Sequence, residues 1–138
     1  MFYEEGAVVV ASTYTKVGGV YDFGFRHDPD NPLETLADYC LGCYTNRNLP
    51  QRVDMLENYV NEYQADGLLI NSIKSCNSFS AGQLLILREI EKRTGKPGAF
   101  IETDLVDPRY FSPSNVKNRL ESYFQMIDQR RKGASAVA

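Results

Sequence analysis

The chain has 138 residues and a net charge of −3, and this length suits one domain with a substantial core. The only basic run is Arg130-Arg131-Lys132, so we expect no nucleic-acid partner. No apolar stretch approaches the roughly 20 residues of a membrane-spanning helix, and the amino terminus does not resemble a signal peptide. With three cysteines and no secretory signal, the sequence predicts a cytoplasmic protein with reduced thiols and no membrane contact.

Three short apolar runs predict strands, at residues 7–11, 68–71 and 99–102. The first run is rich in β-branched residues, as is typical of a strand covered on both faces. Helical periodicity separates the runs in a β-α-α-β-α-β-α order, which predicts an α/β fold with a small parallel sheet and flanking helices. Because the sheet is small and its first strand lies so near Met1, we expect a fragment of a longer subunit. The division predicted is a single domain at 1–132 and a mobile tail at 133–138.

Helices are predicted at about 32–40, 50–64, 78–93 and 113–131. The first begins at Asn31-Pro32 with Glu34 in capping-box spacing, and Ser78 or Ser80 is expected to cap the third. Each helix has an apolar face that we expect to be buried. These faces are Leu33, Leu36 and Ala37; Val53, Leu56, Val60 and Tyr63; Leu84, Leu87 and Ile90; and Val116, Leu120, Tyr123, Phe124 and Ile127.

The connection at 12–30 is long, and loops of this length are often functional or contact a partner. Its aromatic residues are Tyr21, Phe23 and Phe25. His27 lies among acidic residues, as is typical of a solvated surface histidine. A ligand or proton-transfer role would need partners in space.

Residues 66–80, DGLLINSIKSCNSFS, run from a turn through a strand to Cys76 and the start of a helix. In a parallel α/β sheet, ligands bind beyond the carboxyl ends of the strands. Cys76 is therefore a candidate for chemistry, and a partly buried structural thiol is the alternative. Lys74 and the N–H groups of the following helix would favour its thiolate form.

Cys40 and Cys43 form a C-x-x-C pair, which can serve as a redox pair or as half of a metal site. The pair lies at the end of a predicted helix, where the helix dipole does not favour a thiolate. No second pair of suitable spacing follows, so a complete zinc site is not expected. Two unlinked thiols and a functional pair are both open.

Glu102 ends the third predicted strand, and Asp104, Asp107 and Arg109 follow it. If the strands are parallel, this acidic segment lies at the same sheet edge as Cys76. It is either a substrate or partner loop or a set of turn and capping residues. No G-x-G-x-x-G or G-x-x-x-x-G-K motif is present, so a nucleotide site is not supported.

The ordered series DGLLINSIKSC, SFSAGQLLILREIEKRTGKP, AFIETDLVDPRYFS and NVKNRLESYFQMI resembles the 2-hydroxyacyl-CoA dehydratase and benzoyl-CoA reductase superfamily. The likeness extends back through QRVDMLENYVNEYQ and covers about residues 32–128. It corresponds to the C-terminal domain of a family subunit, about the last third of such a chain. The final part of the series resembles the reductase branch slightly more.

This resemblance implies a flavodoxin-like three-layer fold, a paralogous partner subunit and an oxygen-sensitive [4Fe–4S] cluster. It also implies an ATP-hydrolysing activator that supplies low-potential electrons for an acyl-CoA thioester substrate. Cys76 corresponds to the family's C-terminal cluster ligand, with Ser75, Asn77 or Ser78 as hydrogen-bond donors to the cluster sulfurs. The family's other cysteine ligands precede this segment, and Cys40 and Cys43 are candidate additional ligands.

A single matching cysteine cannot hold a cluster, so we expect this chain alone to be inactive. Two alternatives are open. One is a non-catalytic α/β module for subunit docking that uses the aromatic loop. The other is a small thiol redox protein that uses Cys40 and Cys43.

Overall fold

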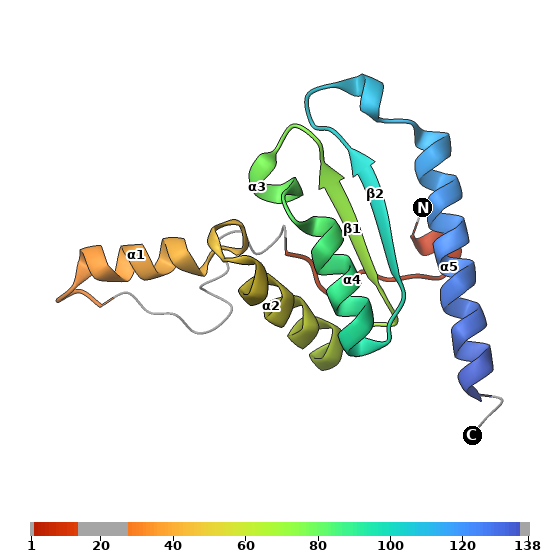
Figure 1. Cartoon of the computed structure of the whole chain (residues 1–138), viewed down its shortest axis with the longest axis horizontal. Helices are drawn as coiled ribbons and strands as arrows, with labels where there is room; N and C mark the ends of the chain where they lie inside the picture. Colours follow the sequence, from red (N-terminus) through yellow and green to blue (C-terminus); the bar gives the residue numbers. More distant parts are fainter. Residues whose placement is uncertain (1, 14–27, 136–138) are drawn as a thin grey trace.

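The computed structural model describes residues 2–13 and 28–135 (Figure 1). Its elements in chain order are η1 (Tyr3–Glu5), α1 (Pro32–Gly42), η3 (Tyr44–Asn46), α2 (Leu49–Glu62), β1 (Leu68–Ile73), α3 (Asn77–Ser80), α4 (Gln83–Thr94), β2 (Gly98–Thr103), η4 (Pro108–Tyr110) and α5 (Pro113–Ser135). The aromatic loop residues Tyr21, Phe23 and Phe25, together with His27, lie outside the described residues.

β1 and β2 form a parallel pair that runs from Leu68 opposite Gly98 to Ile73 opposite Thr103. The backbone N–H of Lys74 also donates to the Thr103 carbonyl at 2.9 Å, which extends the ladder beyond the carboxyl ends of the strands. α3 and α4 form the connection between the two strands. The predicted α/β fold with a small parallel sheet and flanking helices is therefore confirmed.

The strand predicted at residues 7–11 is wrong. In the part of the chain that the structure describes, the sheet contains only β1 and β2, and this segment has no regular secondary structure. The side chains of Val8, Val9 and Val10 are exposed. β-Branched residues favour extended backbone, but a strand forms only where that backbone hydrogen-bonds to a neighbouring strand, and residues 7–11 make no such ladder with β1. Here the segment borders an apolar groove of about 780 Å³ beside β1.

One face of the sheet is covered by α4, against which α2 packs, and these elements contain the main core. Val53, Leu56, Val60, Leu87 and Ile90 are buried as predicted. Ile86 and Ile90 have no exposed surface, and Tyr59 completes the buried face of α2.

The predicted burial of two residues on these helices is wrong. Tyr63 is 44% exposed because it follows Glu62, the last residue of α2. Leu84 is 46% exposed because Gln83 takes the inward position in the first turn of α4.

The start of α4 also differs from the prediction, because neither Ser78 nor Ser80 caps it. α3 is a single turn, and Gly82 then adopts a left-handed conformation with φ +77° before α4 begins. A Cβ at Gly82 would lie 2.7 Å from the side chain of Leu49, so glycine permits both the backbone conformation and the close approach.

α1 begins at Pro32 as predicted, but its expected packing is wrong. Leu33 is 81% exposed, Leu36 is 51% exposed and Ala37 is also exposed, because α1 projects away from the sheet (Figure 1). Asn31 does not cap the helix, since its side-chain amide donates to Asp28 at 3.0 Å. A capping box is instead formed at α2, between Asn48 and Gln51.

α5 contacts β2 and forms the third layer. Its Leu120 and Tyr123 are buried as predicted, whereas Val116, Phe124 and Ile127 are half-buried. Two helical layers around a parallel sheet agree with the three-layer arrangement that the resemblance implies. None of the helices in the described part of the chain is long and apolar enough to cross a membrane.

Candidate functional site

The candidate site lies at the carboxyl edge of the sheet, where β1 ends at Ile73 and β2 ends at Thr103 (Figure 1). The chain after β1 leads through Ser75 to Cys76, and the chain after β2 leads through Asp104. Because the strands are parallel and in register, the two loops leave from the same edge. The structure therefore brings the thiol loop and the acidic loop together.

The backbone on both sides of Cys76 is fixed by hydrogen bonds. Its N–H donates to the Ile73 carbonyl at 3.0 Å, and its own carbonyl accepts from the N–H groups of Phe79 and Ser80 at 3.1 and 2.9 Å. The Ser80 hydroxyl donates to the same carbonyl at 2.9 Å. Cys76 is half-buried at the N-cap of α3, a helix of only four residues. This turn aligns fewer N–H groups at the thiol than the long helix that the sequence predicts.

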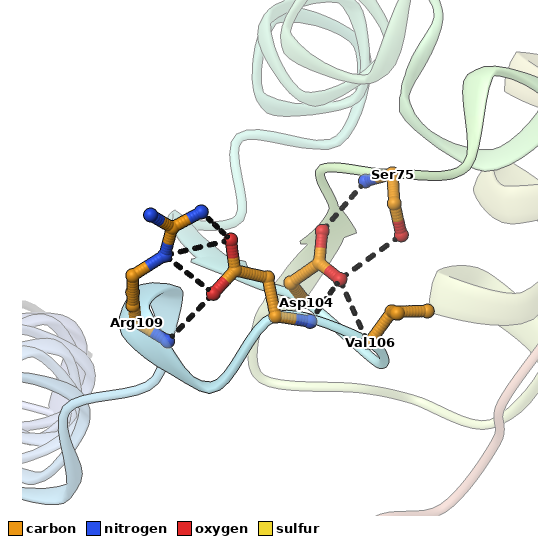
Figure 2. Close-up of polar contacts among 5 residues, drawn as sticks. Ser75, Asp104, Val106 and Arg109 are labelled. Atoms are coloured by element: carbon orange, nitrogen blue, oxygen red, sulfur yellow. Dashed lines mark hydrogen bonds and ion pairs between the residues drawn. The ribbon is translucent and has the colours of Figure 1, made fainter.

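Asp104 connects the two loops (Figure 2). Its carboxylate accepts the backbone N–H of Ser75 at 2.8 Å and the Ser75 hydroxyl at 3.0 Å. It also accepts the N–H groups of Val106 and Asp107 in its own loop, at 2.8 and 3.0 Å. These bonds, from Val106 first and then from Asp107 and Ser75, lower the pKa of Asp104. Asp104 is therefore a fixed anion that positions the loops, and Ser75 uses both of its donors on it.

Asp107 and Arg109 form an ion pair in the loop that follows Asp104. The Arg109 guanidinium donates to both oxygens of Asp107, from Nε at 2.9 and 3.0 Å and from Nη2 at 2.6 Å. This contact is the main cause of the lowered pKa of Asp107. Glu102 lies within β2 and is exposed, and it takes no part in the hydrogen bonds of Asp104 and Asp107 described above.

Cys40 and Cys43 lie at the end of α1, and both are free thiols, exposed at Cys40 and half-buried at Cys43. η3 follows Cys43 directly and contacts α3, which Cys76 caps. The rings of Tyr44 in η3 and Phe79 in α3 are 6.2 Å apart. The described residues contain no group of three or more Cys, His, Asp or Glu side chains arranged to hold a metal ion. They supply single thiols and not a complete set of cluster ligands.

Arg52 is a structural residue of this site that the sequence patterns did not reveal. It is buried in the first turn of α2 and donates to the carbonyls of Arg47 at 2.9 Å, Ser78 at 3.2 Å and Thr45. Its guanidinium also lies over the Tyr44 ring, 5.2 Å from the centroid. Arg52 thus holds η3 and α3 together behind Cys76. The sequence signal that could have indicated this role is the position of Arg52 next to Val53, on the face of the helix that is expected to be buried, where an arginine is unusual.

The fold and site define a parallel α/β domain with a thiol positioned at the carboxyl edge of its sheet. A family model described as "2-hydroxyglutaryl-CoA dehydratase, D-component" matches residues 1–127, and the chain belongs to this family. The superfamily expected from the sequence is therefore confirmed.

The chain is 84% identical over 135 residues to a benzoyl-CoA reductase subunit of Thauera aromatica, a match that covers 98% of this chain and 31% of that protein. It is 26% identical to the alpha subunit of lactoyl-CoA dehydratase from Anaerotignum propionicum, over 76% of this chain and 25% of that protein. It is 25% identical to the alpha subunit of (R)-2-hydroxyglutaryl-CoA dehydratase from Acidaminococcus fermentans, over 80% of this chain and 23% of that protein. The chain thus spans a third or less of the length of these relatives.

Proposed function

We propose that this chain is the C-terminal part of an iron–sulfur subunit of a cytoplasmic, ATP-dependent benzoyl-CoA reductase. The observation that carries the proposal is the 84% identity to the Thauera benzoyl-CoA reductase subunit, compared with 26% or less to the alpha subunits of the two dehydratases. This difference favours the reductase over a 2-hydroxyacyl-CoA dehydratase. The proposed partners are an acyl-CoA substrate, a paralogous subunit and an ATP-hydrolysing activator protein.

Cys76 is the proposed cluster ligand of this chain. A thiolate is the ligand type that iron–sulfur clusters need, and the loop beyond a parallel strand is where an α/β fold binds cofactors. The bound [4Fe–4S] cluster would supply single low-potential electrons to the thioester substrate. The remaining ligands come, in this proposal, from outside the described residues or from Cys40 and Cys43, whose neighbouring η3 contacts α3.

The acidic residues take different roles in this proposal. Asp104 holds the Cys76 loop through Ser75, and Asp107 holds Arg109. Glu102 is exposed at the same edge, and we keep it in the proposed substrate or partner loop without assigning it a direct contact. None of the three is assigned a proton-transfer step.

A segment exchange tests the proposal. The matching 135-residue segment of the Thauera reductase subunit is replaced by this sequence, and the complete reductase is assembled without oxygen. We expect ATP-dependent reduction of benzoyl-CoA close to the parent level. The control exchange uses the corresponding segment of the Anaerotignum alpha subunit, which is 26% identical to this chain. An assembled enzyme that contains its cluster and activator, but no longer reduces benzoyl-CoA, would contradict the proposal.

A second candidate, a non-catalytic docking module, is favoured by the exposed apolar residues Leu33, Leu36 and Leu41 of α1. The two candidates differ at Cys76. In a docking module, Cys76→Ser leaves both assembly and activity of the exchanged enzyme unchanged, whereas in a cluster domain it abolishes activity. The double variant Cys40→Ser, Cys43→Ser tests the thiol redox role in the same assay.

A further inference from the structure

A small cationic pocket lies beside the candidate site, on the side of the sheet edge that faces α5. It is an open surface hollow of about 240 Å³, lined by Lys74 directly after β1, by β2, by η4 and by the first turns of α5, and its charged lining residues are exposed. Since one water occupies about 30 Å³ in the liquid, the pocket has room for a group on the order of several waters in size. Lys74, Arg109 and Arg119 are its basic lining residues, and Glu102 is its acidic one.

The three basic residues of this pocket exceed its two carboxylates, Glu102 and the Asp107 that pairs with Arg109, by one charge. Arg109 is neutralised by Asp107 at 2.6 Å. Lys74 lies 4.4 Å from the centre of the Tyr110 ring, a contact that leaves its full positive charge in place. Arg119 donates from Nη1 to the Phe100 carbonyl at 3.1 Å, so its other donors are left for a ligand. Within the described residues, neither Lys74 nor Arg119 forms an ion pair with a carboxylate.

These groups match the chemistry of phosphoryl oxygens. A guanidinium fork binds two phosphoryl oxygens at once, and a lysine adds a compact point charge. Asn115 and Tyr110 add polar groups to the lining, and the 23-residue α5 begins at Pro113 beside it. We propose that this pocket binds a phosphoryl anion through Lys74 and Arg119. Under the proposed function its source is the phosphate groups of the CoA thioester, and this choice of source rests on that function.

The experiment is an amide NMR titration of this chain with CoA and, separately, with inorganic pyrophosphate. We expect saturable shifts at Lys74, Tyr110 and Asn115. Lys74→Gln weakens the binding on the order of tenfold, because one charge-assisted contact is lost. The matched control is Lys117→Gln, which removes the same charge from α5 at a residue outside the pocket, 3.7 Å from Glu121. This control keeps the parent affinity.

A second variant is expected to change the affinity in the opposite direction, and its result does not depend on whether Lys74→Gln folds. Glu102→Gln removes the carboxylate from the lining and is expected to tighten binding several-fold. Binding of both probes, or of CoA alone, supports the CoA source, and binding of pyrophosphate alone supports a site for free phosphate. No saturable shift with either probe, or equal weakening by Lys74→Gln and Lys117→Gln, overturns the proposal. The readout involves no cluster, so a failure here would leave the proposed function standing.

Discussion

The carboxylate of Asp104 accepts the backbone N–H of Ser75 at 2.8 Å, although 29 residues separate the two in sequence. This hydrogen bond joins the loop after β1 to the loop after β2. The residue that follows Ser75 is Cys76, so the position of the thiol depends on an anion that follows the other strand. Asp104 is therefore a structural link between the two loops.

Asp104→Asn weakens this connection, because an amide retains one acceptor oxygen in place of two charged ones. We expect faster amide hydrogen exchange at Ser75, Val106 and Asp107, with little change in β1 and β2. NMR-detected exchange measures each site. The control is Asp54→Asn, which removes a surface ion pair with Arg93 away from the sheet edge. Equal exchange rates in the two variants at these three amides would show that Asp104 does not hold the loops.

The two loop carboxylates also predict an acid-sensitive site. The pKa values of Asp104 and Asp107 in the folded chain lie below their ordinary value of 3.8. Their contribution to stability is therefore complete above that value and is lost as the pH falls through the lower, folded pKa. We expect the thermal midpoint to fall as the pH is lowered below 3.8, through the depressed pKa values of the two carboxylates. This dependence becomes shallower in Asp104→Asn, and an unchanged slope would contradict the assignment.

Helices with strong apolar periodicity were predictable from the sequence, but the surface that each of their residues faces was not. The inward spacing of Val53, Leu56 and Val60 reflects packing on α4, and the sequence contains that pattern. The exposure of Leu33 and of Val8 depends on which surface lies opposite them, and periodicity carries no information about that. An apolar residue can only be buried where a second surface covers it.

The position of the candidate site in the fold was predictable from the sequence, but the hydrogen bonds that hold it were not. The expectation that Cys76 and Asp104 share a sheet edge needed only parallel strands, and the structure places their loops together. The bond between Ser75 and Asp104 depends on side-chain angles that sequence spacing does not determine. The same reason explains why Arg52 was missed, since two of its carbonyl partners, Thr45 and Arg47, lie in η3 and at its end, and the third, Ser78, lies in α3.

Gly67 permits a close approach at the start of β1. A Cβ there would lie 2.7 Å from the Pro97 carbonyl oxygen and would also overlap the hydroxyl of Tyr123. We expect Gly67→Ala to lower the free energy of unfolding by about 1–3 kcal/mol, because the backbone at Pro97 must shift. Denaturant unfolding measures the change. Gly133→Ala is the control, since a Cβ meets no atom within 4 Å and alanine favours the helix. A Gly67→Ala chain as stable as the parent would contradict this packing.

Arg52→Met tests the buried arginine behind the site. The substitution keeps an apolar stem but leaves the carbonyls of Arg47, Thr45 and Ser78 without their donor. We expect a loss of roughly 2–4 kcal/mol in the free energy of unfolding, measured by denaturant titration. Arg88→Met is the matched control at an exposed position of α4, where a change within about 0.5 kcal/mol is expected. Similar losses in both variants would show that the buried hydrogen bonds are not the cause.

Iron and acid-labile sulfide per subunit decide whether Cys76 is a cluster ligand. The assay uses the complete exchanged subunit, purified without oxygen, as parent, as Cys76→Ser and as Cys40→Ser. We expect iron and sulfide in about a 1:1 ratio in the parent and their loss in Cys76→Ser. If Cys40 is a further ligand, Cys40→Ser shows the same loss. Undiminished iron and sulfide in a folded Cys76→Ser subunit would contradict the proposed role and identify Cys76 as a structural thiol.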